Sequence, residues 1–113
     1  MRWLLRSKIH KATVTDIDLN YVGSIGIDKT LIEKVGILPG ERILIADNTN
    51  GQRLETYVIE EEENSGKIVV YGAASRLIKK GDEIIIMGFE LADDKVEVKN
   101  ILVDENNKFI KFL

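Results

Sequence analysis

The chain has 113 residues without a cysteine, 44% of them hydrophobic and 31% charged, and a formal net charge of −3. This length suits one compact domain, and the lack of thiols excludes disulfides and thiolate metal sites and favours the cytoplasm. The negative charge argues against a nucleic-acid partner. No apolar run approaches the roughly 20 residues of a membrane-spanning helix, so no membrane partner is expected.

The first expected element is a strand over residues 8–16. Alternation would place Lys8, His10 and Ala12 on one face of this strand and Ile9 and Lys11 on the other, an imperfect separation of polar and apolar residues. His10 is the only histidine, and zinc sites need three or four ligands, so no metal site is predicted. Lys8 and His10 are candidates for binding a ligand; a packed or surface histidine is the alternative.

The segment Tyr21-Val22-Gly23-Ser24 contains a bond that could break itself. A serine hydroxyl can attack the preceding carbonyl and convert the amide into an ester. β-Elimination then leaves a dehydroalanine, which hydrolyses to a pyruvoyl group on the new N-terminus. Alone, however, Gly-Ser is a common turn dipeptide. The rest of the sequence is therefore needed to choose between a self-cleaving bond and an ordinary turn.

Residues 28–35 are expected to form a short helix. Asp28 can cap its N-terminus, and Gly36 can end it in a left-handed conformation. Three apolar positions follow helical spacing: Leu31, Ile32 and Val35. Residues 42–47 and 53–60 should then pair as a hairpin, because Asn50-Gly51 between them is the strongest hairpin signal in the chain.

The second strand of this hairpin carries side chains that suit an acidic substrate. Alternation places Arg53, Glu55 and Tyr57 on one face, with Leu54 and Thr56 on the other. An arginine can hold a carboxylate through two parallel hydrogen bonds, and a tyrosine hydroxyl can donate a proton. The alternative is an exposed arginine and a half-buried strand tyrosine with no shared role.

The remaining segments continue the alternation of short strands and turns. The expected elements are a charged turn at 61–66, a strand at 67–71, a short helix at 73–80, a strand at 83–87 and a hairpin of 96–103 and 108–112. Gly72-Ala73-Ala74 precedes and opens the helix, where small residues let a ligand approach backbone N–H groups. A plain strand-to-helix turn is the alternative.

Two segments repeat one pattern of helix, glycine, acidic residue and buried strand. The first runs from Leu31 to Ile45 and the second from Leu77 to Ile86. Such a duplication favours a closed barrel with pseudo-two-fold symmetry, in which the helices cap the ends and closure removes exposed sheet edges. The same junction also occurs by chance in unrelated mixed domains.

Taken together and in this order, the motifs resemble the bacterial aspartate 1-decarboxylases, which depend on a pyruvoyl group. The resemblance covers residues 1 to about 90 and rests on Lys8-Ile9-His10, Leu19-Asn20-Tyr21, Gly23-Ser24, Thr49-Asn50-Gly51-Gln52-Arg53, Thr56-Tyr57, Gly72-Ala73-Ala74 and Gly81-Asp82. It implies a mainly β fold in which residues 1–113 form one six-stranded double-psi β-barrel with short capping helices. It also implies a homotetramer with active sites between subunits.

The resemblance implies self-cleavage between Gly23 and Ser24, giving a short chain 1–23 and a chain 24–113 that begins with pyruvoyl. Thr56 is expected to stabilise the oxyanion of the acyl shift. The amino group of L-aspartate would form a Schiff base with the pyruvoyl ketone, an electron sink for the loss of CO2. β-Alanine would be released for pantothenate and coenzyme A biosynthesis, without metal or pyridoxal phosphate.

The resemblance also assigns the residues that bind the substrate. Arg53 and Lys8 would hold the carboxylates of aspartate, and Tyr57 would protonate the carbanion. The remaining contacts are expected from His10, Tyr21, Gly72, Ala73 and Ala74.

Two positions depart from the family pattern. Tyr71 stands where the family usually has asparagine, and Ala46 stands where many members have a bulky aromatic residue. Three hypotheses follow: a processed decarboxylase, an intact double-psi barrel that acts as a binding module, and a family member that stays uncut because Tyr71 alters the cleavage geometry. The sequence does not separate the first from the third.

Overall fold

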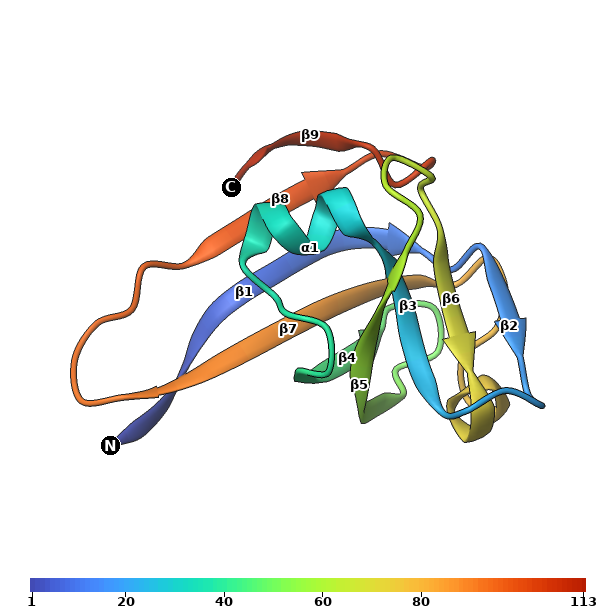
Figure 1. Ribbon diagram of the computed structural model, residues 1–113, viewed down its shortest axis with the longest axis horizontal. Coiled ribbons are helices and arrows are strands. Elements are labelled where there is room, and N and C mark those ends of the chain that lie inside the picture. The colour runs from blue at the N-terminus through green and yellow to red at the C-terminus, as the bar shows by residue number, and fades with distance from the viewer.

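β-Strands dominate the computed structural model, which describes residues 1–113 (Figure 1). The elements in chain order are β1 (Arg2–Thr13), β2 (Asp16–Asp18), β3 (Ser24–Asp28), α1 (Lys29–Val35), β4 (Arg42–Asp47), β5 (Arg53–Glu61), β6 (Ile68–Tyr71), the 3-10 helix η1 (Gly72–Arg76), β7 (Glu83–Ala92), β8 (Lys99–Val103) and β9 (Phe109–Phe112). The prediction of a mainly β fold with short helices is confirmed.

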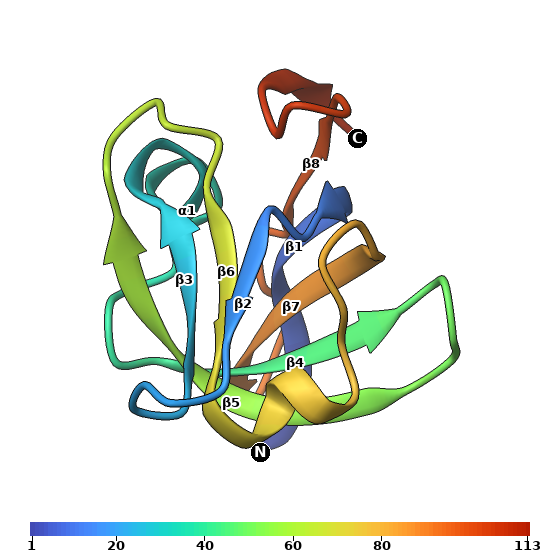
Figure 2. The same cartoon turned by 90° about the vertical axis from the view of Figure 1, so that its right-hand side faces the viewer.

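The nine strands form one continuous sheet in the order β2-β6-β3-β5-β4-β7-β1-β8-β9. The pairs β2–β6, β3–β5 and β1–β8 are parallel, and the other neighbours are antiparallel. The sheet curves around its buried face (Figure 2). A closed six-stranded double-psi barrel remains an expectation from the family resemblance.

The predicted faces of the first strand are wrong at one point. Ile9 and Ala12 are both fully buried, although simple alternation places them on opposite faces. The pairing of β1 with β7 is irregular between these two residues, and Lys11 has a φ of 65°. A bulge at Lys11 therefore turns both side chains toward the core.

Helix α1 begins and ends where its caps predict. The side chain of Asp28 accepts a hydrogen bond from the N–H of Thr30, at 2.8 Å, and Gly36 closes the helix at a φ of 74°. The predicted helix at 73–80 is wrong in type and length, because η1 is a short 3-10 helix that ends at Arg76. Both predicted hairpins, β4–β5 and β8–β9, are confirmed as antiparallel pairs.

The repeated pattern has a structural counterpart at the centre of the sheet. Strands β4 and β7 pair antiparallel, with Ile45 opposite Ile86. Both residues are fully buried, as are their repeat partners Ile43 and Ile84 at no more than 1% exposure. The two copies therefore contribute equivalent side chains to one core.

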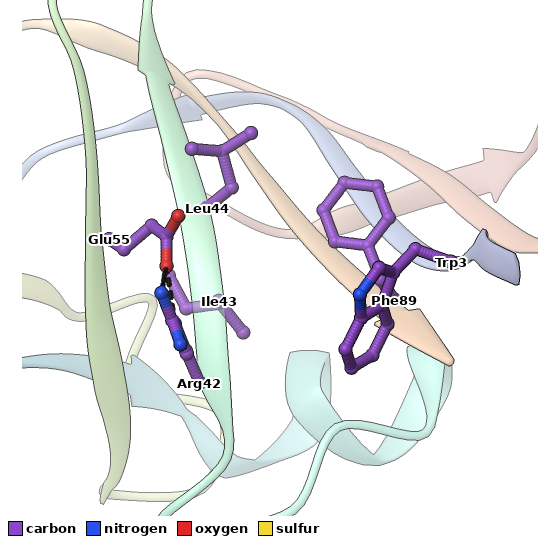
Figure 3. A pocket seen from close by; sticks show the side chains of 6 residues that line it. All are labelled: Trp3, Arg42, Ile43, Leu44, Glu55 and Phe89. Carbon is purple, nitrogen blue, oxygen red and sulfur yellow. Dashed lines mark hydrogen bonds and ion pairs between the residues drawn. The ribbon is translucent and has the colours of Figure 1, made fainter. Parts of the chain in front are cut away.

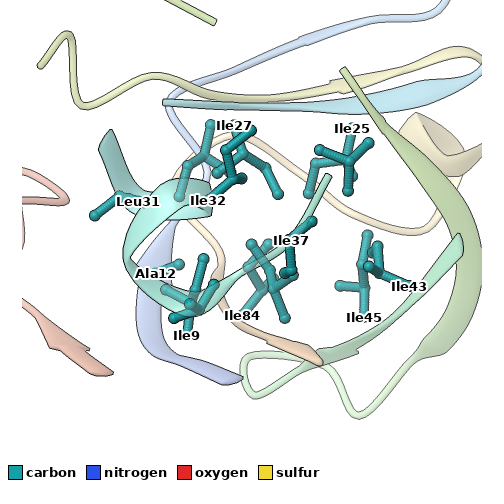
Figure 4. Close-up of a cluster of buried hydrophobic side chains, with 14 of the residues drawn as sticks. Ile9, Ala12, Ile25, Ile27, Leu31, Ile32, Ile37, Ile43, Ile45 and Ile84 are labelled. Carbon is teal, nitrogen blue, oxygen red and sulfur yellow. The ribbon is translucent and has the colours of Figure 1, made fainter. Parts of the chain in front are cut away.

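The core is a single cluster of 19 buried residues, nearly all isoleucine, leucine and valine (Figure 4). Burying one such side chain contributes about 1.5–3 kcal/mol. Helix α1 adds Leu31, Ile32 and Val35 to this cluster. The packed interior holds β3 and β5 in place, and these two strands carry several of the expected catalytic residues.

Two buried aspartates lie together where β4 ends and β7 begins. Burial, followed by hydrogen bonding and repulsion between the two carboxyl groups, raises the pKa of Asp47 beside Asp82. The folded protein therefore binds a proton at the Asp47 carboxyl group more tightly than the unfolded chain does. The resulting stabilisation is present below the ordinary pKa of an aspartate and is lost as pH rises through the raised pKa.

Asp47→Asn is accordingly expected to raise the melting temperature at neutral pH by about 4 °C, which corresponds to roughly 1 kcal/mol. An asparagine keeps an acceptor for the N–H groups of Thr49 and Asn50 and removes a buried charge. Thermal melts at several pH values check this, and the gain should shrink toward about pH 4. Asp104→Asn, in a turn without an acidic partner, is the control. A lower melting temperature for Asp47→Asn at neutral pH would contradict the account.

Candidate functional site

The loop of residues 19–23 crosses the end of β6 on its way from β2 to β3. Strand β6 lies between those two strands, with Asp18 opposite Tyr71 on one side and Ser24 opposite Tyr71 on the other. The loop and η1 lie side by side in both views (Figures 1 and 2). Tyr71 therefore sits beneath the segment that leads to Gly23 and Ser24.

Ser24 is the point at which this exposed loop enters the interior. Its exposed fraction is 1%, whereas Val22, two residues earlier, is 65% exposed. The Ser24 hydroxyl donates a hydrogen bond to the Val22 carbonyl at 3.0 Å. The hydroxyl thus turns back over Gly23.

Gly72 lies directly against Gly23. A Cβ atom at position 72 would be 2.6 Å from the Gly23 Cα and 3.0 Å from the Gly23 nitrogen. Gly72 also has a φ of 73°, which L side chains rarely adopt. Only a glycine at position 72 leaves the backbone around Gly23 and Ser24 undisturbed. Ala73 and Ala74 follow in η1.

Strand β5 carries two further expected residues just before the point where it pairs with β3. Ile25 on β3 pairs with Val58 on β5 in parallel register. Tyr57 and Thr56 are the two residues that precede Val58 on β5, and Ser24 precedes Ile25 on β3. Tyr57 and Thr56 themselves pair with Arg42 and Ile43 of β4.

The burial pattern of β5 alternates as predicted along its first half. Arg53, Glu55 and Tyr57 are exposed, while Leu54 and Thr56 are half-buried. Glu55 forms an ion pair with Arg42 of β4. No ion pair involves Arg53, so its guanidinium is free to hold an anionic substrate.

Lys8 and His10 lie elsewhere in the same chain. Both are on β1, which is four strand spacings from β3 in the sheet order. Neither strand that pairs with β3 therefore carries Lys8 or His10. The buried Nδ1 atom of His10 has no hydrogen-bond partner.

Sequence reasoning overlooked two residues beside the cleavage segment, Glu61 and Gly26. The Tyr71 hydroxyl donates a hydrogen bond to a Glu61 carboxylate oxygen at 2.9 Å. A Cβ atom at Gly26 would lie 2.1 Å from that carboxylate. The only available signal was an isolated glycine within a strand, which indicates close approach of another group.

A hollow of about 350 Å³ lies against β4, β5 and β7 near the start of β1 (Figure 3). Its lining consists of Trp3, Arg42, Ile43, Leu44, Glu55 and Phe89. Trp3 and Phe89 line one side of the hollow, across from the Arg42–Glu55 ion pair. None of the expected catalytic residues lines this hollow.

Two further features concern metal-ligand clusters and membrane-spanning helices. No group of three or more histidine, aspartate or glutamate side chains lies where it could hold a metal ion. None of the helices has the length and apolar character needed to cross a bilayer.

Comparison with known proteins gives one consistent match. A family model described as aspartate decarboxylase matches residues 1–110. A protein named aspartate 1-decarboxylase from Thermosipho africanus is 50% identical over 96% of this chain and 92% of its own length. Its namesake from Thermoanaerobacter pseudethanolicus is 51% identical over 95% of both chains. The one from Clostridium botulinum is 53% identical over 94% of this chain and 76% of its own length.

Proposed function

Because this chain belongs to the aspartate decarboxylase family, we propose that it converts L-aspartate to β-alanine and CO2 after cutting its own backbone between Gly23 and Ser24. Family membership makes it an enzyme, an aspartate 1-decarboxylase. The observation that carries the self-cleavage is the position of Ser24, a buried hydroxyl turned back over Gly23, with Gly72 against the same residue.

Cleavage begins when the Ser24 Oγ attacks the Gly23 carbonyl carbon. The C–N bond breaks, an ester C–O bond forms, and the hydroxyl proton passes to the Ser24 nitrogen. Loss of the Ser24 Cα proton then expels the Gly23 carboxylate and leaves a dehydroalanine, which takes up water and releases ammonia. The products are a chain 1–23 and a chain 24–113 that begins with pyruvoyl.

Thr56 supports the first of these steps. Negative charge develops on the Gly23 carbonyl oxygen during the attack, and a preorganised hydroxyl donor at that point lowers the barrier. Support for this role comes from the parallel pairing of β3 with β5, which begins with Ile25 opposite Val58, two residues after Thr56. Its half-buried position on β5 limits competition from water.

The residues around Gly23 also suit the pyruvoyl group, because Gly72 leaves space that a Cβ atom would fill. The ketone of that group supplies the electron sink for decarboxylation. Arg53 holds a substrate carboxylate, and Tyr57 donates a proton to the substrate carbon that loses CO2. Tyr21, Ala73 and Ala74 line the same substrate site.

Lys8 and His10 are proposed to enter the site from a neighbouring subunit of a homotetramer. Their position on β1, four strands from β3 in the sheet order, supports this assignment. Exposed apolar side chains such as Trp3, at 68%, offer surface for such an assembly.

We place the reaction in the cytoplasm, where β-alanine would supply pantothenate synthesis. The absence of cysteine is in keeping with that compartment. The function itself is tested by incubating the purified protein with L-aspartate and measuring β-alanine and CO2. Absence of both products from a fully cut preparation would contradict it.

Arg53→Ala is expected to leave self-cleavage intact and to lower kcat/KM by a factor of about 100 or more, because a charge-assisted carboxylate contact is lost. Intact mass and β-alanine assays measure the two effects separately. Arg42→Ala is the matched control, an exposed arginine one strand away whose partner is Glu55; its activity should stay near the parent value. Failure of Arg53→Ala to cut would instead make Arg53 a structural residue.

A further inference from the structure

Tyr71 is the residue over which the loop of residues 19–23 passes. It pairs with Asp18 at the end of β2 and with Ser24 at the start of β3, so residues 19–23 span its position. The rings of Tyr21 and Tyr71 pack with centroids 4.8 Å apart and planes tilted by 54°. An aromatic pair of this kind favours one arrangement of the two side chains. Tyr71 therefore supports the loop two residues before Gly23.

Glu61 holds the other end of the Tyr71 side chain. The Tyr71 hydroxyl donates to the Glu61 carboxylate at 2.9 Å, which fixes the direction of the ring. Burial, with a smaller contribution from Glu61, raises the pKa of Tyr71 to about 12. The hydroxyl consequently remains a neutral donor throughout the ordinary pH range, and its bond to Glu61 persists.

Gly26 makes this bond sterically possible. The Glu61 side chain passes over Gly26 so closely that a Cβ atom there would lie 2.1 Å from Oε2, and 2.7 Å from Cδ. Gly26 lies inside β3, between neighbours on β5 and β6. Its backbone does not have a positive φ, so an alanine suits the strand and disturbs mainly the Glu61 side chain.

From these contacts we infer that Tyr71 and Glu61 form a positioning pair for self-cleavage, with Gly26 providing the space that the pair needs. This inference rests on the proposed function. Glu61 orients Tyr71, Tyr71 supports Tyr21, and the loop then presents the Gly23 carbonyl to the Ser24 hydroxyl. Tyr71 thus replaces the usual asparagine of the family with an aromatic support, and it favours cleavage rather than preventing it.

The rate of cleavage in freshly purified precursor tests the pair. Glu61→Gln, Tyr71→Phe and Gly26→Ala are each expected to slow cleavage about fivefold, the effect of losing one hydrogen bond. Tyr71→Ala, which also loses the ring contact, should be slower still. Glu60→Gln, an exposed neighbour on β5, is the control and should cut at the parent rate.

Tyr71→Asn, which restores the residue usual in the family, is the decisive comparison. Slower cleavage in this variant supports the pair, because the aromatic support and the bond to Glu61 are both lost. Cleavage faster than in the parent would overturn the inference and make Tyr71 an inhibitor of processing. Equal rates for Glu61→Gln and the parent would also overturn it.

A second measurement does not depend on cleavage and separates this inference from the proposed function. In a Ser24→Ala background, chymotrypsin should cut after the exposed Tyr21 about fivefold faster when Glu61→Gln or Gly26→Ala is added. Glu60→Gln should have no effect. A parent chain that never cuts itself would refute the proposed function, whereas an unchanged chymotrypsin rate would refute only the positioning pair.

Discussion

Ser24→Ala is expected to give one uncut chain of residues 1–113 that produces no β-alanine. Without the Oγ atom no ester forms, no dehydroalanine follows, and the ketone on which decarboxylation depends never arises. The whole enzymatic acceleration is lost, which is typically at least ~10⁶-fold. Denaturing mass spectrometry and a β-alanine assay measure the two consequences in the same sample.

The fold should survive this change. The Ser24 hydroxyl makes a single side-chain hydrogen bond, to the Val22 carbonyl, and an alanine fits the same buried space. Ser65→Ala, in the turn after β5, is the matched control and should cut and turn over like the parent. Decarboxylation by an intact Ser24→Ala chain would mean that the mechanism is wrong.

Gly72→Ala is expected to abolish or nearly abolish self-cleavage, with a fall in rate of about 100-fold or more. The added Cβ would meet the Gly23 Cα at 2.6 Å and the Gly23 nitrogen at 3.0 Å, both of them backbone atoms that no side-chain rotation can move away. A displacement of about 1 Å at a reacting bond is enough for such a loss. The cut fraction over time, followed by intact mass, measures it.

The backbone strain of an alanine at a positive φ has to be distinguished from the steric clash between positions 72 and 23. Alanine at a positive φ costs about 1–2 kcal/mol wherever it occurs. Gly40→Ala supplies the comparison, because Gly40 has a φ of 85° but open space around its added Cβ. It should lose similar stability from strain and still cut normally. If both variants cut at the same rate, contact between Gly72 and Gly23 has no part in processing.

Most elements of the fold could be predicted because their signals are local. Asp28 and Gly36 mark the two ends of α1 by capping chemistry, and Asn50-Gly51 marks the β4–β5 turn. The faces of β1 could not be predicted past Ile9, since a bulge at Lys11 depends on the pairing with β7. The 3-10 helix η1 likewise ends earlier than its composition indicates.

The candidate site likewise contains residues that could be predicted from the sequence and residues that could not. Gly23 and Ser24 are adjacent in the chain, so the sequence alone identifies the bond. The parallel register between β3 and β5, which sets Ile25 opposite Val58, is encoded by no local pattern. The contact of Glu61 with Tyr71 over Gly26 joins three strands, so only the assembled sheet reveals it.

The intact mass of the purified parent protein under denaturing conditions shows whether the Gly23–Ser24 bond is cut and a pyruvoyl group is formed. We expect two fragments, residues 1–23 and residues 24–113, the second of them one ammonia lighter than the same fragment with an N-terminal serine. That mass difference identifies the pyruvoyl group and excludes ordinary proteolysis at the same bond. A single mass for the uncut chain of 113 residues, unchanged after prolonged warming, would contradict the account.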